Sequence, residues 1–349
     1  MFVTRHLWSQ VAFATAAALA TSAPVLAATG PDVTGPIVHE RLAVYFIHGK
    51  SAEGPVPLTL AEALAKGAVT VHETGTVNEL AIENTSDEEV FIQSGDIVKG
   101  GQQDRTLTVS MIVPPKSGRV PLAAFCVEQG RWAQRGGEDV TAFASSEKML
   151  PSKDAKLALR QMVKGIIGAD GETKDTSDKQ MKVWDSVSKA QADLSENLGV
   201  AAVASEASPS SLQLTLESGK VEETVKTYVA ALEAKGLETQ DIVGFAFAVD
   251  GKLASAEVYP SNGLFRKMWP KLLRASATEA IGAVKAEDKA EAPKPEGVAA
   301  YLAEADAAKA ETGAVDAANV VETRDTDDVS YVETKRAKGD FVHRSYMVK

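Results

Sequence analysis

An alternating run of apolar side chains in the first half of the chain constrains the fold most strongly. From Thr106 onward, apolar and mostly hydroxyl-bearing side chains alternate with the two-residue period of a strand that has one buried face. The segment PPKSG (114–118) cannot continue a central strand, because proline lacks the N–H that the sheet needs. The apolar run RVPLAAFCVE (119–128) predicts the returning strand, and Pro121 within it indicates an edge or an irregular start. We therefore predict an antiparallel hairpin that ends at Phe125.

Short strands fill the first part of the chain, residues 28–150. They follow one another with no long helix between them, which favours an antiparallel β-sandwich or a barrel-like sheet. One short helix is expected over 57–67, with Thr59 as its N-cap. We predict a β-rich half over these residues.

Residues 151–284 have a different pattern, with apolar side chains at helical spacing. Asp250-Gly251 lies between two apolar runs and is the strongest short signal for a hairpin, which we place at 241–259. Helices are expected at 151–168, 177–199, 218–236 and 262–282. Pro270 lies inside the last of these helices and is expected to kink it or to begin a second segment.

The clearest of these helices covers residues 177–199. Its apolar side chains form one stripe, which we expect to face the core: Met181, Trp184, Val187, Leu194 and Leu198. Ser177 and Gln180 have the spacing of a capping box at its start.

The last part of the chain divides into a polar and an apolar stretch. Residues 285–314 are rich in Ala, Glu and Lys, which predicts a linker and an exposed helix. Residues 315–349 predict three short strands, a β-meander apolar enough to dock on the core. Taken together, the patterns predict an α+β fold.

The N-terminal residues resemble a bacterial signal peptide. Arg5 supplies a short positive region, an apolar stretch follows, and Val25-Leu26-Ala27 fits the cleavage pattern. We expect 1–27 to be a signal peptide, the mature chain of 349 − 27 = 322 residues to be periplasmic, and no stable membrane span after processing. An uncleaved N-terminal anchor is the alternative.

Charge and cysteine content limit the classes of partner. The formal net charge is −11, so the surface repels nucleic acid phosphates and anionic lipid, and neither is expected as a partner. Cys126 is the single cysteine, which leaves no internal disulfide. Its apolar surroundings favour a buried small side chain over a reactive thiol.

Familiar catalytic signatures are absent from the sequence. It has no phosphate-binding glycine loop of the Walker or dinucleotide type, no nucleophile elbow and no His-Glu-x-x-His motif. His39, His48, His72 and His343 do not have the spacing of a local metal site, so we predict neither a metal nor a cofactor.

The polar stretch GGQQDR (100–105) is the first candidate for a site. Gly100 and Gly101 allow a close approach of backbone to a ligand, and Gln103 and Arg105 lie on one side of an extended chain. The arginine fork suits a carboxylate or a phosphate. The alternative is structural: Arg105 pairs with a neighbouring carboxylate and joins two loops.

The stretch CVEQGRW (126–132) is the second candidate. Glu128 is a candidate acid, base or orienting group, and Arg131 and Trp132 follow a glycine turn. The structural alternative is a salt bridge at a strand end, with Trp132 covering the core. Since both polar stretches flank one predicted hairpin, they should emerge at the same end of it. His343 joins them as a candidate if the last strand docks nearby.

These stretches carry a family resemblance. GGQQDR and CVEQGRW, the block DGKLASAEVYPSNGLFRKMWPKLLRA (250–275) and the terminal FVHRSYM (341–347) resemble the ADP-ribosylglycohydrolase- and rhodanese-phosphatase-associated protein domain. The family takes its name from genomic company, which implies a role near ADP-ribose or other nucleotide-derived metabolites.

Two functions fit the sequence. One is an exported protein with a polar site for a small anionic, nucleotide-derived molecule, in which Arg105 and Arg131 hold the anion, Gln103 orients it and Glu128 acts as acid or base. The other is a non-catalytic scaffold or interaction module, in which the same residues form a structural polar network. The sequence identifies no protein partner and does not decide whether the chain is an enzyme.

Overall fold

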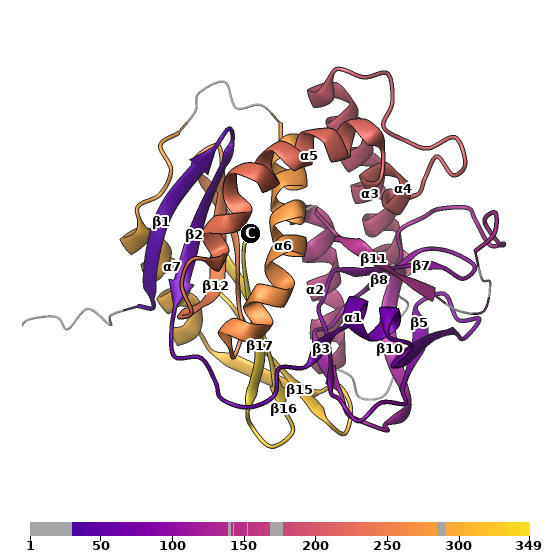
Figure 1. The fold of residues 1–349 in the computed structure, drawn as a ribbon, viewed down its shortest axis with the longest axis horizontal. Coiled ribbons are helices and arrows are strands. Elements are labelled where there is room, and N and C mark those ends of the chain that lie inside the picture. Colours follow the sequence, from indigo (N-terminus) through magenta and orange to yellow (C-terminus); the bar gives the residue numbers. More distant parts are fainter. Residues whose placement is uncertain (1–29, 139–140, 142, 152, 168–176, 285–289) are drawn as a thin grey trace, which may run out of the picture.

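The structure, a computed structural model, describes residues 30–349 except 139–140, 142, 152, 168–176 and 285–289 (Figure 1). The predicted signal peptide, residues 1–27, lies outside the described residues. Within them, no helix is long and apolar enough to span a membrane.

An eight-stranded antiparallel sheet forms one body of the molecule. Its order is β1-β2-β12-β13-β17-β16-β15-β14, so it combines strands from the beginning, middle and end of the described chain. The strands are β1 (Asp32–His39), β2 (Leu42–His48), β12 (Ile242–Val249), β13 (Lys252–Val258), β14 (Ala310–Ala314), β15 (Asn319–Asp325), β16 (Val329–Arg336) and β17 (Phe341–Val348). The predicted hairpin turn is confirmed, since Asp250 and Gly251 both have positive φ, +48° and +78°.

A half-barrel forms the second body and uses the strands of the β-rich half. A six-stranded sheet has the order β11-β7-β8-β10-β5-β4, and a small sheet has the order β3-β6-β9. The strands are β3 (Leu58–Thr59), β4 (Val69–Glu73), β5 (Glu79–Asn84), β6 (Val90–Ile92), β7 (Asp96–Gly100), β8 (Arg105–Leu107), β9 (Met111–Val113), β10 (Gly118–Cys126) and β11 (Phe143–Met149).

The predicted hairpin is present, but its first strand is divided between the two sheets. β8 pairs with the end of β10, and Cys126 lies opposite Arg105. After Thr108 the chain leaves that sheet, and β9 pairs with β6 instead. The hydroxyl positions of the run are buried as well as the apolar ones, because the segment lies between two sheets rather than over one core. Pro121 pairs with β5 before the ladder to β8 begins at Ala124.

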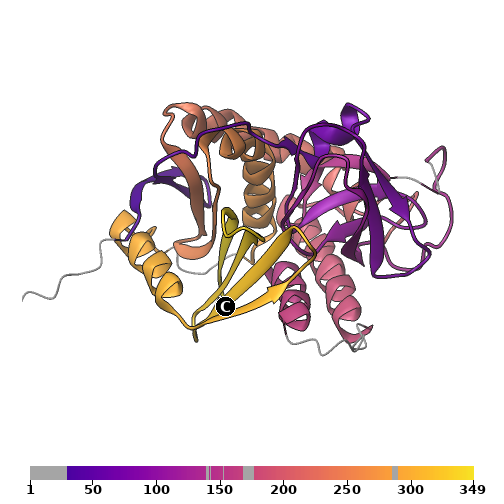
Figure 2. The same ribbon diagram turned by 90° about the horizontal axis from the view of Figure 1, so that it is seen from below.

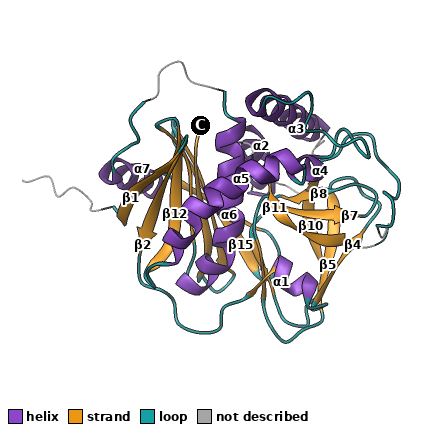
Figure 3. Ribbon diagram, turned by 45° about the horizontal axis from the view of Figure 1, so that its top comes forward, coloured by secondary structure: helices purple, strands orange, loops and turns teal. Residues whose placement is uncertain are grey.

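Helices cover both faces of the eight-stranded sheet and fill the space between the two bodies (Figure 3). They are α1 (Leu60–Ala65), α2 (Lys153–Ile167), α3 (Ser177–Leu198), α4 (Leu212–Leu216), α5 (Gly219–Leu232), the 3-10 turn η1 (Glu233–Leu237), α6 (Asn262–Gly282) and α7 (Pro295–Ala307). Phe245 and Phe247 of β12 pack with α5 and α6, whereas Ala246 packs with α7. This division follows from the alternation of side chains along a strand.

Three local expectations are resolved by the helices. Thr59 caps α1 in a capping box with Glu62, as predicted. α6 runs as one helix through Pro270, so no second segment begins there. Val187 of the stripe predicted for α3 is buried, but Met181 is 56% exposed, because Gln180 and Val183 belong to the buried face of the helix.

The C-terminal strands β15–β17 form a meander that docks as predicted, between α7 and the half-barrel (Figure 2). β14 adds a fourth strand from within the predicted linker. Asn319 joins this meander to the half-barrel, because its side chain makes two 2.9 Å hydrogen bonds with the backbone of Ile112 in β9. The α+β fold, with a half-barrel in the first half and a C-terminal meander, is confirmed.

Candidate functional site

The two polar stretches meet at one end of β8 and β10. Because Arg105 and Cys126 are cross-strand partners, the residues before one and after the other are adjacent. Gln103 Nε2 donates to the Glu128 carbonyl at 2.9 Å, and the Asp104 N–H donates to Glu128 Oε2 at 3.2 Å. The structure therefore brings Gln103, Arg105 and Glu128 together, and Arg131 joins them.

Two buried carboxylates, Asp104 and Glu128, form the centre of this cluster, and both are 0% exposed. Arg131 Nε donates to Glu128 Oε2 at 2.7 Å. Arg135 Nη1 donates to Asp104 Oδ2 at 2.8 Å and to Glu128 Oε1 at 3.2 Å. The hydroxyl of Ser208 also donates to Glu128. Each carboxylate thus has several charged or polar donors, as buried charges require.

The surroundings raise the pKa of the Asp104 carboxyl above its ordinary value. Burial raises its pKa, the hydrogen bond from Arg135 opposes this, and the nearby charge of Glu128 raises the pKa further. Ser211 on the segment that begins α4 donates to Asp104 at 3.0 Å. The cluster therefore connects the half-barrel to α4 as well as to the loop after β10.

Arg105 is less completely paired than its neighbours. It is 0% exposed, and its Nη1 donates to the Gln103 carbonyl at 2.8 Å. Its Nη2 lies 3.7 Å from Glu73 Oε2, and neither Nε nor Nη2 makes a hydrogen bond. The ring of Trp132, 46% exposed, lies 5.6 Å from the guanidinium carbon, within cation–π range.

The two glycines of GGQQDR shape the turn that begins this arrangement. Gly100 and Gly101 have φ of +112° and +54°, and a Cβ on Gly101 would overlap the Phe143 ring. Their carbonyls accept hydrogen bonds from Arg131 at 3.3 and 3.2 Å. Here the glycines let the backbone approach an arginine of the same chain.

Sequence reasoning missed four contributors to this cluster, which are Asp104, Arg135, Ser208 and Ser211. Arg135 forms its closest ion pairs with Asp104 and Glu138, both at 2.8 Å. A second arginine four residues after Arg131 was the available signal. Ser208 has no sequence signal, since it lies 80 residues from Glu128 along the chain.

His343 lies in a different cluster from Glu128, contrary to the expectation that the last strand would bring it there. Its Nε2 is 3.0 Å from Glu257 Oε2, and its ring packs against Tyr259 and Phe91. The reason is topological: β17 pairs with β13 and β16 in the eight-stranded sheet, away from the end of β10.

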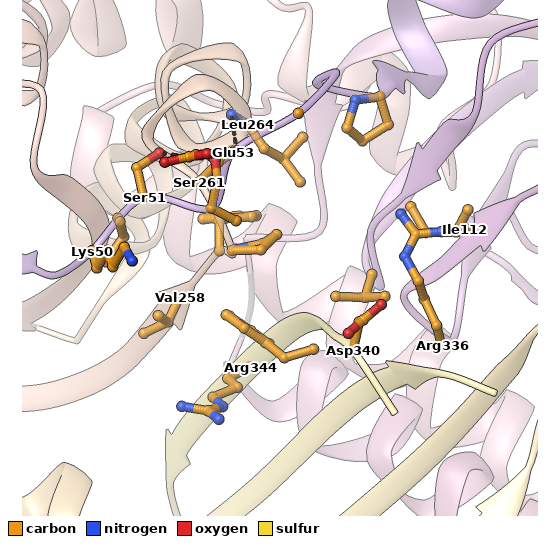
Figure 4. Close-up of a pocket in the computed structure, with 18 of the residues that line it drawn as sticks. Lys50, Ser51, Glu53, Ile112, Val258, Ser261, Leu264, Arg336, Asp340 and Arg344 are labelled. Atoms are coloured by element: carbon orange, nitrogen blue, oxygen red, sulfur yellow. Dashed lines mark hydrogen bonds between the residues drawn. The ribbon is translucent and has the colours of Figure 1, made fainter. Parts of the chain in front are cut away.

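An open cleft of about 890 Å³ lies elsewhere, beside the junction of the two bodies (Figure 4). The connection from β2 to β3, the start of α6 and the turn from β16 to β17 surround it. Buried apolar side chains form part of its wall, and they include Ile112, Leu264 and Val342. None of the site residues predicted from the sequence lines this cleft.

Charged side chains lie on opposite sides of the cleft (Figure 4). Lys50 and Arg344 lie on one side, and Arg336 and Asp340 lie on the other. Arg336 is held by Glu89 through contacts of 2.5 and 2.7 Å. Arg344 donates through Nε to Glu333 at 3.0 Å. Lys50 is exposed and, among the described residues, has no carboxylate within 4 Å.

The chain matches one known protein family over most of its length. The family model of the ARG and Rhodanese-Phosphatase-superfamily-associated Protein domain matches residues 30–347. The chain belongs to this family. No curated protein and no solved structure matches it. The family match covers the half-barrel, the eight-stranded sheet and the helices between them, so the clefts and clusters above all lie within the family domain.

In the part of the chain that the structure describes, no group of three or more His, Cys, Asp or Glu side chains is arranged to hold a metal ion. The acidic cluster around Asp104 and Glu128 already has arginines where a cation would lie.

Proposed function

We propose that this chain is an exported protein that binds a small anionic molecule, of the size of a nucleotide-derived metabolite, in the open cleft. The observation that carries the proposal is the cleft of about 890 Å³, in which the unpaired Lys50 faces a partly apolar wall. Ligand pockets commonly have volumes of roughly 300–1,000 Å³, largely apolar walls and a few polar groups that orient the ligand.

The electrostatics of the cleft support an anion. Lys50 carries an unpaired charge at its rim, and Arg344 uses its Nε for Glu333, which leaves the outer nitrogens of its guanidinium. The 21-residue helix α6 begins at the cleft, and Ser261 at its N-cap accepts from the Leu264 N–H at 3.2 Å. Negative groups are favoured near a helix N-terminus. Glu53 and Asp340 are the acidic side chains of the lining, and they oppose this positive charge.

The connection from β2 to β3, which lines the cleft, is held in place by hydrogen bonds in the absence of a ligand. Ala52 donates to the Pro260 carbonyl at 2.8 Å, and the Ser51 hydroxyl accepts from the Asn262 N–H at 3.1 Å. A preformed site loses less conformational entropy when it binds a ligand. This organisation supports binding by a largely rigid site.

Binding is tested by calorimetric titration of the purified chain with inorganic phosphate, a nucleoside monophosphate, ADP-ribose and a dicarboxylate. Lys50→Glu is expected to weaken binding of the preferred anion at least about tenfold, since it reverses the unpaired charge. Lys252→Glu is the matched control, because Lys252 is an exposed lysine that does not line the cleft. Equal losses in the two variants, or no binding in the whole panel, would contradict the proposal.

The scaffold alternative is favoured for the cluster around Glu128 by a specific observation. The buried carboxylates Glu128 and Asp104 are paired with Arg131 and Arg135, whose side chains are 11% and 10% exposed, which is the arrangement of a structural network. We propose that this network stabilises the half-barrel. If it binds the ligand instead, Glu128→Gln will weaken anion binding in the same titration while Lys50→Glu will not.

Export rests on the sequence pattern of residues 1–27. Expression of the full chain in a Gram-negative host, followed by fractionation and intact-mass measurement, is expected to give a periplasmic protein that begins at Ala28. An unprocessed chain in the membrane fraction would favour the uncleaved anchor.

A further inference from the structure

A small cavity of about 40 Å³ lies inside the protein, apart from the open cleft and from the Glu128 cluster. α2, α6, β13 and β17 contribute side chains to it, and so does the half-barrel through Gln93 and Ser94. Its polar lining includes Arg160, Ser255, Glu257 and His343. The cavity therefore lies where the two bodies meet.

Arg160 is an unusual component of this lining. It is 7% exposed, and none of the described carboxylates lies within 4 Å of it. Its Nη1 donates to the carbonyl of Ser330, and its Nη2 donates to the Ser345 hydroxyl at 2.6 Å. Buried guanidinium groups are normally paired with an anion, because the charge has lost its hydration.

Three further polar atoms around the cavity have no hydrogen-bond partner. They are Ser255 Oγ, His343 Nε2 and Glu257 Oε2, and their residues are 3%, 2% and 8% exposed. His343 and Glu257 lie 3.0 Å apart without the alignment of a hydrogen bond. The other oxygen of Glu257 accepts from Ser345 at 3.0 Å. Buried polar atoms of this kind take a water molecule or an ion as their partner.

Three side chains around the cavity can donate a hydrogen bond to a bound group, and one of them is a guanidinium. Arg160, Ser255 and His343 can each donate, and Glu257 is the carboxylate that faces them. Lys156 also lines the cavity, and its charge is offset by Glu279 at 3.0 Å. A buried guanidinium with further donors beside it favours an acceptor with negative charge.

The volume limits the size of that acceptor. A water molecule needs roughly 10–15 Å³ of such space, so about 40 Å³ holds two or three waters or one small ion. A nucleotide cannot fit. We propose that this cavity binds a single small monovalent anion, a halide or a carboxylate group, between Arg160, Ser255 and His343. Because the cavity joins the half-barrel to the eight-stranded sheet, the bound anion stabilises the contact between them.

Crystals grown in sodium bromide or sodium formate test the site directly. Anomalous scattering is expected to locate one bromide in the cavity beside Arg160. Formate density at the same place identifies a carboxylate site, and bromide alone identifies a halide site. Water molecules alone in both crystals would overturn the proposal.

A solution experiment uses the thermal midpoint at constant ionic strength, with sodium methanesulfonate, whose anion is too large for the cavity, replaced stepwise by bromide or formate. The midpoint of the unmodified chain is expected to rise with one of these anions. Ser255→Ala removes one donor with a small change in volume and is expected to weaken the apparent affinity about tenfold. Ser186→Ala is the matched control, since Ser186 is a buried serine of α3 that bonds Lys182.

His343→Gln keeps a donor and provides a second variant if Ser255→Ala folds poorly. Its effect on the anion-dependent rise is expected to be smaller than that of His343→Leu. An unmodified midpoint that does not respond to bromide or formate would refute the site. So would equal responses in Ser255→Ala and Ser186→Ala.

Discussion

The charged residues in the two polar stretches are largely buried, so each one depends on hydrogen-bond partners within the protein. Glu128 and Arg105 are both 0% exposed, yet the carboxylate of Glu128 accepts from several donors, whereas two nitrogens of Arg105 have no acceptor. A carboxylate with full pairing stabilises its surroundings only while all its partners remain. The ligand-binding and catalytic roles predicted for these residues stay predictions, and the geometry makes their structural role the stronger one.

Replacement of Glu128 by Gln tests that structural role. The variant removes a buried charge that faces Arg131 and Arg135, so two largely covered guanidinium groups lose a partner. We expect the free energy of unfolding to fall by about 3 kcal/mol. Thermal and urea unfolding measure the change. Glu223→Gln breaks an exposed pair with Lys220 and is expected to change stability by less than about 0.5 kcal/mol.

Cys126 gives a second prediction for a single residue. Burial raises the pKa of its thiol to about 11, and the charge of Arg105 opposes this. We expect the thiol of the folded chain to react with a disulfide reagent at pH 8 at least about a hundredfold more slowly than in 8 M urea, because the thiolate is the nucleophile. Rapid modification of the folded chain would show that the site opens.

The same raised pKa predicts how stability depends on pH. Between the ordinary value of 9.0 and about 11, the folded thiol keeps its proton while the unfolded thiol loses it. Stability is therefore full below pH 9 and falls as the pH rises towards 11, by up to about 3 kcal/mol. Urea unfolding of Cys126→Ala across this range is expected to lack this component.

Among the elements, α3 provides a polar side chain that takes the place of a neighbouring strand as the hydrogen-bond partner of β10. Beyond Ala123, β10 has no pairing with β5, and Gln180 of α3 takes that place. The Gln180 amide accepts from the Cys126 N–H at 2.9 Å and donates to the Cys126 carbonyl at 2.8 Å. The helix therefore turns Gln180 inward and leaves Met181 exposed. An apolar pattern alone does not predict this rotation, since it counts glutamine as a surface residue.

Gln180→Ala is expected to destabilise the fold by about 2–4 kcal/mol, because both backbone groups of Cys126 lose a buried partner on that side. Urea unfolding followed by far-UV circular dichroism measures this effect. Gln161→Ala, at an exposed position of α2, is the control and is expected to be close to neutral. A neutral Gln180→Ala would mean that water satisfies these groups.

In the whole molecule, the eight-stranded sheet depends on both ends of the described chain. β1 and β2 come before the half-barrel in sequence but pair beside β12, and β17 lies between β13 and β16. In the sequence, the half-barrel is thus inserted between β2 and β12, which are neighbours in the eight-stranded sheet. Stability of such a sheet requires the last strand, since its loss exposes two unpaired edges.

A chain that ends at Asp340, and therefore lacks β17, is expected to aggregate on expression. The exposed edges of β13 and β16 are the physical reason. A chain that ends at Val348 retains the strand and serves as the control. Size-exclusion chromatography of both chains measures the difference, and a monomeric, folded truncated chain would contradict the prediction.

Local patterns were sufficient to predict many of the elements of this protein. The Asp250-Gly251 hairpin, the capping box of Thr59, the helices and the α+β class all depend on residues within a few positions of one another. The spacing of apolar side chains and the turn residues that predict these elements all lie within short segments. The meeting of Gln103 and Glu128 was also predictable, because one hairpin connects them.

Tertiary structure alone decided the contacts between residues that no single hairpin connects. Ser208 reaches Glu128 across 80 residues, and His343 lies beside Glu257 rather than Glu128, because strand order is determined by long-range packing. The open cleft and the Arg160 cavity form between segments that are far apart in sequence. No short sequence motif marks the cleft or the cavity, because both depend on how distant segments pack against one another.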